Sequence, residues 1–153
     1  MALLSIFAKK PLLSEEDTSM IVEAIRGSEK KTSGEIRVYV ESHCKFVDAL
    51  DRASEIFYGL KMDATENRNA VLVYVAMKDK QLAVFADEGI YKKAGEGFWN
   101  KAVKAMLQHF NSSDYGSGIA SIVTETGNTL QANFPYDSNT DKNELPDDIV
   151  FGK

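Results

Sequence analysis

The most constraining feature of the sequence is a predicted β-hairpin over residues 69–89, NAVLVYVAMKDKQLAVFADEG. Two runs rich in β-branched and aromatic residues, 70–77 and 81–86, flank the charged tripeptide Lys78-Asp79-Lys80. The first run is apolar at every position instead of alternating, which is typical of a strand covered on both faces. The sheet that contains it therefore needs helices above and below.

Composition sets the class of protein. A chain of 153 residues with 44% hydrophobic and 27% charged residues predicts one globular domain with its own core. The net charge of -5 argues against nucleic-acid binding, because that affinity comes mainly from Lys and Arg side chains on phosphates. The single cysteine, Cys44, cannot form an internal disulfide, which fits a reducing compartment.

The N-terminal sequence MALLSIFAKK places an apolar run before its two lysines, the reverse of a secretory signal. No stretch approaches the roughly 18 to 20 apolar residues that span a bilayer, so we expect a cytoplasmic protein. We expect the apolar residues of this segment to pack onto the domain; a peripheral membrane contact is the alternative. They are Leu3, Leu4, Ile6 and Phe7.

Periodicity predicts the remaining elements. Ser14 is a helix N-cap with an acidic residue three positions on, and that helix should end near Gly27. Residues 35–41 alternate as a strand, and apolar stripes predict helices over 48–60, 98–110 and 115–132. Residues 90–97 are predicted to be a connector.

The composition changes after Phe134 to Pro, Asp, Asn and Ser. We therefore expect one domain over residues 1–135 and an extended C-terminal tail over residues 136–153. Leu145 and Phe151 indicate that part of this tail docks on the domain.

The order of the elements predicts a three-layer α/β/α sandwich with a mixed sheet. A strand-helix-strand crossover gives a parallel pair, and the hairpin adds an antiparallel strand. Residues 32–35, 66–69 and 87–89 should then meet at one end of the sheet. These three loops carry most of the candidate chemistry.

At those loops the chain resembles the TPM-domain family, named after thylakoid-lumen, photosystem-associated and receptor-modulating proteins. Its pattern has a Thr-Gly pair opening the first strand, an Asn before the second, and Gly-Ile or Gly-Leu after the third. The matching sequences here are Thr32-Ser33-Gly34-Glu35-Ile36, Asn67-Arg68-Asn69-Ala70-Val71-Leu72 and Asp87-Glu88-Gly89-Ile90.

The resemblance covers nearly the whole chain. In particular, the chain is similar to small soluble bacterial members of the family that carry Phe-Trp and Asn-Glu-Leu-Pro motifs. Here these are Phe98-Trp99 and Asn143-Glu144-Leu145-Pro146. Ser33 separates Thr32 from Gly34, and Asp87 stands where many members have glycine. The resemblance implies an α/β/α sandwich and, for some members, weak acid phosphatase activity and binding of divalent cations, especially calcium.

The same loops contain oxygen ligands suited to Ca²⁺ or Mg²⁺. The predicted metal-binding residues are Glu66, Asn67, Asn69, Asp87 and Glu88. Affinity should be weak, about 10⁻⁴ to 10⁻³ M, because no twelve-residue EF-hand loop is present. The alternative is that Asp87 caps the following turn and the others are solvated loop residues.

Other chemistry is poorly supported. His43 and Cys44 are adjacent in an extended segment, so their side chains point to opposite faces, and we expect a buried or inert thiol. With His109 the only other histidine, a structural zinc site is improbable. The sequence contains no P-loop, dinucleotide-binding, zinc-protease or nucleophile-elbow motif.

Two functions remain. We favour a non-catalytic, monomeric domain that binds divalent cations and has a protein partner or a membrane contact. The alternative is a low-activity, metal-dependent acid phosphatase in which the cation polarises a phosphoryl oxygen. Arg68 is the best-placed phosphate clamp for that alternative.

Overall fold

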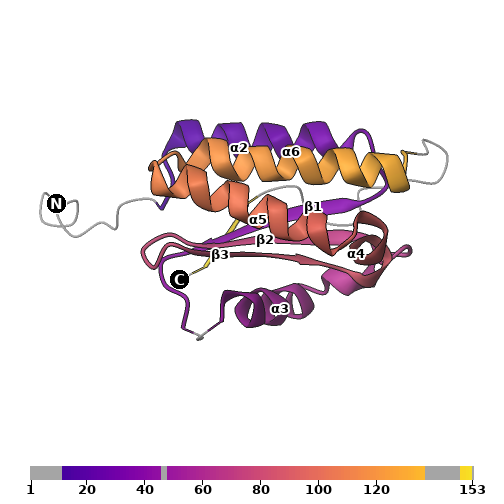
Figure 1. Cartoon of the computed structure of the whole chain (residues 1–153), viewed down its shortest axis with the longest axis horizontal. Helices are drawn as coiled ribbons and strands as arrows, with labels where there is room; N and C mark the ends of the chain where they lie inside the picture. The colour runs from indigo at the N-terminus through magenta and orange to yellow at the C-terminus, as the bar shows by residue number, and fades with distance from the viewer. Residues whose placement is uncertain (1–11, 46–47, 137–148, 153) are drawn as a thin grey trace, which may run out of the picture.

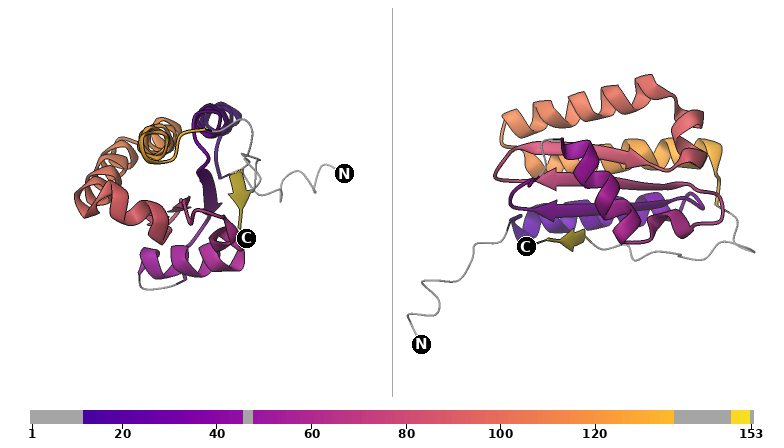
Figure 2. Two further views of the ribbon diagram at one scale, coloured as in Figure 1. Left: turned by 90° about the vertical axis from the view of Figure 1, so that its right-hand side faces the viewer. Right: turned by 90° about the horizontal axis from the view of Figure 1, so that it is seen from below.

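The fold is a mixed four-stranded sheet between two layers of helices. The structure, a computed structural model, describes residues 12–45, 48–136 and 149–152. The strands lie in the order β3-β2-β1-β4. Helices α2, α5 and α6 cover one face and α3 covers the other (Figures 1 and 2). The predicted α/β/α sandwich is therefore confirmed.

The strands are β1 (Glu35–Glu41), β2 (Ala70–Ala76), β3 (Gln81–Ala86) and β4 (Ile149–Phe151). The helices are α2 (Glu15–Glu29), α3 (Ala49–Gly59), α4 (Glu88–Ala94), α5 (Glu96–Asn111) and α6 (Tyr115–Asn133), with the short 3-10 helix η1 (Met62–Ala64). β1 pairs in parallel with β2 and β4, and β2 pairs with β3 in antiparallel orientation.

Strand β2 is the centre of the core, since all seven of its residues are buried. Val71, Val73 and Val75 belong to the apolar cluster under α2, α5 and α6. Leu72 and Tyr74 belong to a second cluster under α3. Successive side chains of a strand point to opposite faces, so one unbroken apolar run supplies both clusters.

Two predictions about element bounds differ from the structure. Helix α2 continues past Gly27 to Glu29. The predicted connector over residues 90–97 is instead α4 and the start of α5. Asp87 caps α4 through the amide of Glu88, and Gly95, with a φ of 86° that favours glycine, separates the two helices. The segment thus holds most of α4 and the first residues of α5, despite its two glycines.

The fourth strand was not predicted. Ile149 of β4 is 8% exposed beside β1, whereas Phe151, the residue expected to anchor the tail, is 51% exposed. Leu145 and the Asn143-Glu144-Leu145-Pro146 motif lie outside the described residues, as does the N-terminal apolar segment. The division of the chain at residue 135 stays a prediction.

Helices α2 and α6 pack closely where α6 carries Gly127. A Cβ atom at this position would lie 2.3 Å from the Ser28 hydroxyl and 3.3 Å from the Ser28 Cα. The second contact is with backbone, so rotation of a side chain cannot relieve it. By contrast, a Cβ atom on Gly27 of α2 would meet nothing within 4 Å outside its own stretch of helix.

This contrast gives a paired prediction. Gly127→Ala should lower the free energy of unfolding by about 1–3 kcal/mol, because it forces α2 and α6 apart. Gly27→Ala should raise it by about 0.5–1 kcal/mol, because alanine loses less backbone entropy in a helix. Urea unfolding of both variants provides the measurement, and equal effects would contradict the proposed close packing.

Candidate functional site

The three loops predicted to meet do lie together at one end of the sheet. The Glu35 amide donates to the Asn69 carbonyl at 3.4 Å, and the Gly89 amide donates to the Arg68 carbonyl at 2.8 Å. The Asn69 side-chain amide lies 3.4 Å from the Ser33 hydroxyl. The predicted topology is confirmed. Because β1 runs parallel to β2 and β3 runs antiparallel to it, the starts of β1 and β2 and the end of β3 lie at the same end of the sheet.

Gly89 allows the second and third loops to touch. A Cβ atom at position 89 would lie 2.1 Å from the Asn67 carbonyl oxygen and 2.5 Å from that of Arg68. Both atoms are backbone, so no larger residue fits without moving the loop. Gly89 of the Asp87-Glu88-Gly89-Ile90 motif is therefore needed for the close packing of these two loops.

Asp87 is the central side chain of this end. It is 3% exposed and accepts hydrogen bonds from Arg68 Nε at 2.8 Å and Nη2 at 2.9 Å. It also accepts from the Glu88 amide at 2.8 Å. The carboxylate therefore caps α4, as the alternative interpretation of the sequence proposed, and also holds an arginine in a bidentate pair.

Arg68 lies between two carboxylates. Its Nη1 is 3.3 Å from Glu88 Oε1, in addition to the pair with Asp87. The hydrogen bonds to Asp87 raise the pKa of the guanidinium. The Arg68 side chain is 38% exposed, and its backbone φ of 50° is uncommon for a residue with a Cβ atom. A side-chain cation thus occupies the point where the acidic groups converge.

The remaining predicted ligands differ from Asp87 in burial or in the face of the sheet they occupy. Glu66 and Asn67 are exposed on the loop before β2. Asn69 is 1% exposed, and its Oδ1 has no hydrogen-bond partner in the described part of the chain. Because Val71 pairs with Ala86, the alternation of side chains places Asn69 and Asp87 on opposite faces of the sheet.

In this arrangement the loops do not form a complete metal-binding site. Within residues 12–45, 48–136 and 149–152, no group of three or more His, Cys, Asp or Glu residues is arranged to hold a metal ion. The backbone segments converge, but Asn69 does not share a face with Asp87. A cation that reaches Asp87 must first displace Arg68.

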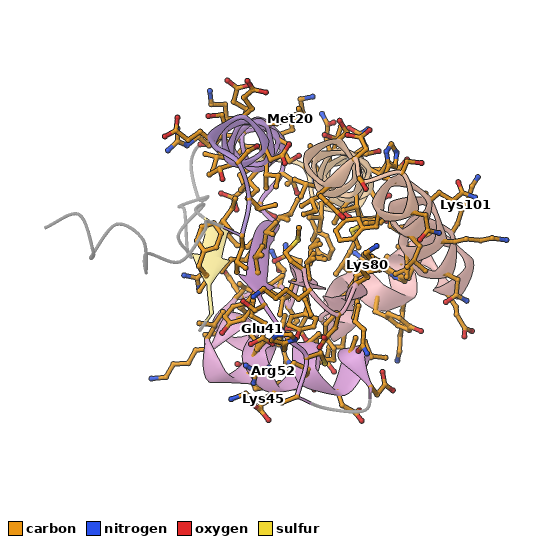
Figure 3. The ribbon with its side chains drawn as sticks, turned by 90° about the vertical axis from the view of Figure 1, so that its left-hand side faces the viewer. Met20, Glu41, Lys45, Arg52, Lys80 and Lys101 are labelled. Atoms are coloured by element: carbon orange, nitrogen blue, oxygen red, sulfur yellow. The ribbon has the colours of Figure 1, made fainter. Side chains whose placement is uncertain are left out.

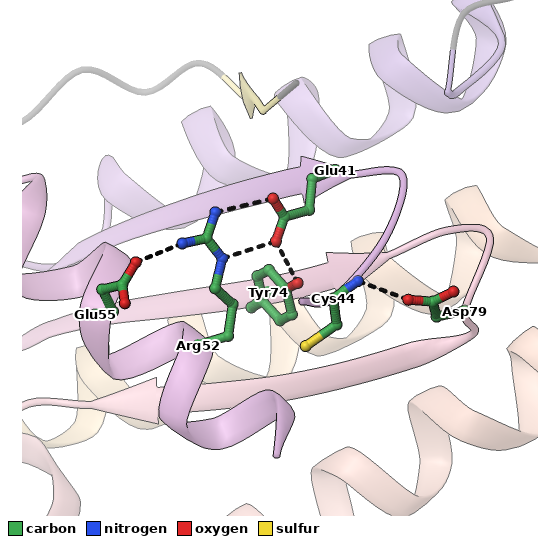
Figure 4. A network of polar contacts seen from close by, with 6 residues as sticks. All are labelled: Glu41, Cys44, Arg52, Glu55, Tyr74 and Asp79. Atoms are coloured by element: carbon green, nitrogen blue, oxygen red, sulfur yellow. Dashed lines mark hydrogen bonds and ion pairs between the residues drawn. The ribbon is translucent and has the colours of Figure 1, made fainter. Parts of the chain in front are cut away.

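The opposite end of the sheet carries a polar network that sequence reasoning missed (Figure 4). Glu41, at the end of β1, is 4% exposed and accepts from Arg52 Nε and Nη2 at 2.9 Å each. The Tyr74 hydroxyl donates to the same carboxylate. Arg52 also donates to Glu55 at 2.6 Å. The available signal was an acidic residue at the last position of a buried strand, followed by an arginine near the start of the next helix.

The electrostatics of this network stabilise the ionised carboxylate. Burial acts to raise the pKa of Glu41, but the hydrogen bonds from Arg52 and Tyr74 outweigh it, and the pKa is lowered. Hydrogen bonding to Glu41 raises the pKa of Arg52. Burial, followed by the bond to Glu41, raises the pKa of Tyr74. The pair therefore stays charged at neutral pH.

His43 and Cys44 lie beside this network and contact the hairpin turn. The imidazole Nδ1 of His43 is 2.8 Å from Asp79 Oδ1, and the Cys44 amide donates to Asp79 Oδ2 at 2.7 Å. Hydrogen bonding to His43 lowers the pKa of Asp79. Cys44 is intermediate in exposure, so the expectation of a buried thiol holds only in part.

The fold and its loops define the class of protein. It is a three-layer α/β/α domain in which Arg68 pairs with Asp87 and Glu88 at the end of the sheet where β2 begins. A family model for the TPM domain matches residues 6–129. The chain belongs to the TPM-domain family, which confirms the resemblance found in the sequence.

Solved structures share this fold. The NMR structure of the BA42 protein from the psychrophilic bacterium Bizionia argentinensis is 36% identical, with a TM-score of 0.85, over 95% of this chain and 99% of that one. The N-terminal domain of a P. gingivalis protein is 16% identical, with a TM-score of 0.66, over 80% and 79%. A search of curated proteins finds no match.

A third similar structure, the N-terminal domain of the cg2496 protein from Corynebacterium glutamicum, shares the fold. It is 13% identical, with a TM-score of 0.57, and the match covers 90% of this chain and 80% of that one. Among the described helices, none is long and apolar enough to cross a membrane.

The Glu41 network yields a prediction about stability and pH. Glu41→Gln should lower the free energy of unfolding at pH 7 by about 3 kcal/mol, because it removes the buried charge that Arg52 pairs with. Glu55→Gln, at the exposed end of the same arginine, should change it by no more than about 0.5 kcal/mol.

The folded-state pKa of Glu41 is lowered, so its contribution is complete above the ordinary glutamate pKa of 4.5 and is lost as the pH falls further. The native protein should therefore lose more stability than Glu41→Gln between pH 5 and pH 2. Urea unfolding at several pH values measures this difference, and parallel curves would rule it out.

Proposed function

We propose that this protein is a non-catalytic TPM domain that binds a divalent cation, Ca²⁺ or Mg²⁺, weakly at the loops preceding β1 and β2 and following β3. The observation that carries the proposal is the position of Arg68. Its guanidinium is held by the carboxylates of Asp87 and Glu88, so the loops already stabilise a positive charge at this point.

A metal ion would take the place of that guanidinium. Arg68 is partly exposed and can move into water, whereas Asp87 is fixed by its cap on α4. The vacated oxygens of Asp87 and Glu88 are hard ligands of the kind that Ca²⁺ and Mg²⁺ prefer. Glu66 and Asn67, on the exposed loop beside them, would supply further oxygens.

Asn69 could be a ligand only after a rearrangement of its loop. Its side chain lies on the other face of the sheet, so it cannot join Asp87 unless the loop before β2 rearranges. Its buried Oδ1, which has no hydrogen-bond partner among the described residues, favours such an added ligand. Because binding must displace Arg68, we expect a dissociation constant of roughly 10⁻⁴ to 10⁻³ M or weaker.

The direct test is a titration of the full chain with Ca²⁺ and with Mg²⁺, followed by amide NMR. Shifts that saturate at millimolar metal and concentrate in residues 32–35, 66–69 and 87–90 would support the proposal. Spectra that stay unchanged at millimolar concentrations of either ion would eliminate it.

A variant tests the role of Arg68 as the competing cation. Arg68→Gln should bind Ca²⁺ about fivefold tighter or more, because it removes a positive charge within a few ångströms of the ion. Lys78→Gln, which removes the same charge from the hairpin turn at the opposite end, should change affinity less than twofold. Calorimetric titration gives both constants, and equal affinities for the two variants would refute the competition.

The observation that favours the phosphatase as a second candidate function is the partly exposed guanidinium of Arg68 beside the carboxylates of Asp87 and Glu88. A cation that displaces Arg68 leaves a guanidinium beside the bound metal, where it can pair with a phosphoryl oxygen. The metal would polarise a phosphoryl oxygen and activate a water molecule. Turnover of an activated aryl phosphate with Mg²⁺ present should then fall to background in Asp87→Ala. Turnover that is unchanged in this variant would identify a contaminating enzyme.

A further inference from the structure

A mainly apolar groove lies along β3. It has a volume of about 410 Å³, and residues 82–86 of β3 form its floor. Leu50 of α3 lies on one wall, and Tyr91 of α4 and Val103 of α5 lie on the other. Trp99, the only tryptophan of the chain, also lines it. None of the five proposed metal ligands lines the groove.

The floor of this groove is an edge strand. In the part of the chain that the structure describes, β3 pairs with β2 on one side and with no strand on the other. Every second residue of such a strand directs its backbone N–H and C=O outward, where an extended segment can bind them. Edge strands of this kind accept added strands by main-chain hydrogen bonding.

The walls carry exposed apolar side chains. Leu50 is 48% exposed and Tyr91 is 42% exposed. Leu107 lies one turn after Val103 on α5, on the same side of the helix, and is also exposed. Tyr58 packs against Phe85 of the floor with ring centroids 5.9 Å apart, and half of its surface is exposed. A strand placed here would be covered by apolar groups on both faces.

The sequence of the chain contains a segment with the matching pattern. Residues 2–8, Ala-Leu-Leu-Ser-Ile-Phe-Ala, lie outside the described residues and are apolar at every position except Ser5. An outermost strand between two helical layers needs apolar residues on both faces, as β2 has. Lys9 and Lys10 follow directly.

Charge and chain direction favour one orientation. Asp48 lines the groove near the hairpin, and Asp51 lies in the same first turn of α3. Helix α2 also begins at the hairpin end of the molecule (Figure 1). A segment antiparallel to β3 would leave the groove at this end, with its lysines beside these aspartates and its chain directed toward Ser14.

The length of the connecting chain agrees with this path. Helix α2 packs over β1, so its start is displaced from the groove by about three strand spacings sideways and one layer of the sandwich, a direct distance of roughly 17 Å. Residues 8–12 span about the same distance when extended. We propose that residues 3–7 of the chain bind in this groove of the same molecule as an added strand antiparallel to β3.

Amide exchange of the full chain tests the proposal. The outward-pointing amides of residues 82–86 should exchange at least tenfold faster in the double variant Leu4→Asp/Phe7→Asp than in the native protein. Met20→Asp puts a negative charge on an exposed apolar site of α2, remote from the groove, and should leave these rates unchanged (Figure 3). Light scattering should show monomers for all three proteins.

Two results would overturn the proposal. Equal exchange rates in the native protein and the double variant would show that residues 3–7 do not occupy the groove. Protection that disappears on dilution, together with a dimer mass, would assign the groove to a second copy of the chain. If the double variant does not fold, Leu50→Asp changes the groove wall instead, and because Leu50 is half exposed this variant should fold and give the same acceleration.

Discussion

The burial of β2 on both faces is the constraint on which the rest of the structure depends. Each of its seven residues is inaccessible to solvent, so the strand must have neighbours on both sides and helices above and below. Helix α3 covers the face that carries Leu72 and Tyr74, and α2, α5 and α6 cover the face that carries Val73. The parallel and antiparallel partners of this one strand also decide which loops meet.

The two ends of the sheet carry arginine-carboxylate pairs in different surroundings. Arg52 holds Glu41 in a nearly closed environment with a tyrosine hydroxyl as a third partner, and an ion pair of this kind is costly to break. Arg68 holds Asp87 with part of its guanidinium in water, where exchange for another cation is far easier. The first pair therefore serves stability, and the second can serve binding.

The sequence anticipated the elements whose signals are local. The hairpin follows from two apolar runs around a charged turn, and α3, which Asp48 caps in the structure, follows from its apolar stripe. Helix α4 was missed because Gly95 and Gly97 suggested a connector, whereas Gly95 ends the helix and Gly97 lies in the first turn of α5. Strand β4 was missed because three residues carry little periodicity and its partner, β1, is more than a hundred residues away.

By itself the sequence determined the layered α/β/α architecture and the convergence of three loops at one end, because burial patterns and strand directions follow from local residue order. Only the tertiary structure decided which side chains meet there. Whether Asn69 shares a face with Asp87 depends on strand register, and whether Asp87 is open to a metal depends on Arg68 reaching it across the sheet end. The sequence shows which side chains could be ligands. Which side chains contact one another is decided by the packing of segments that are distant in the chain.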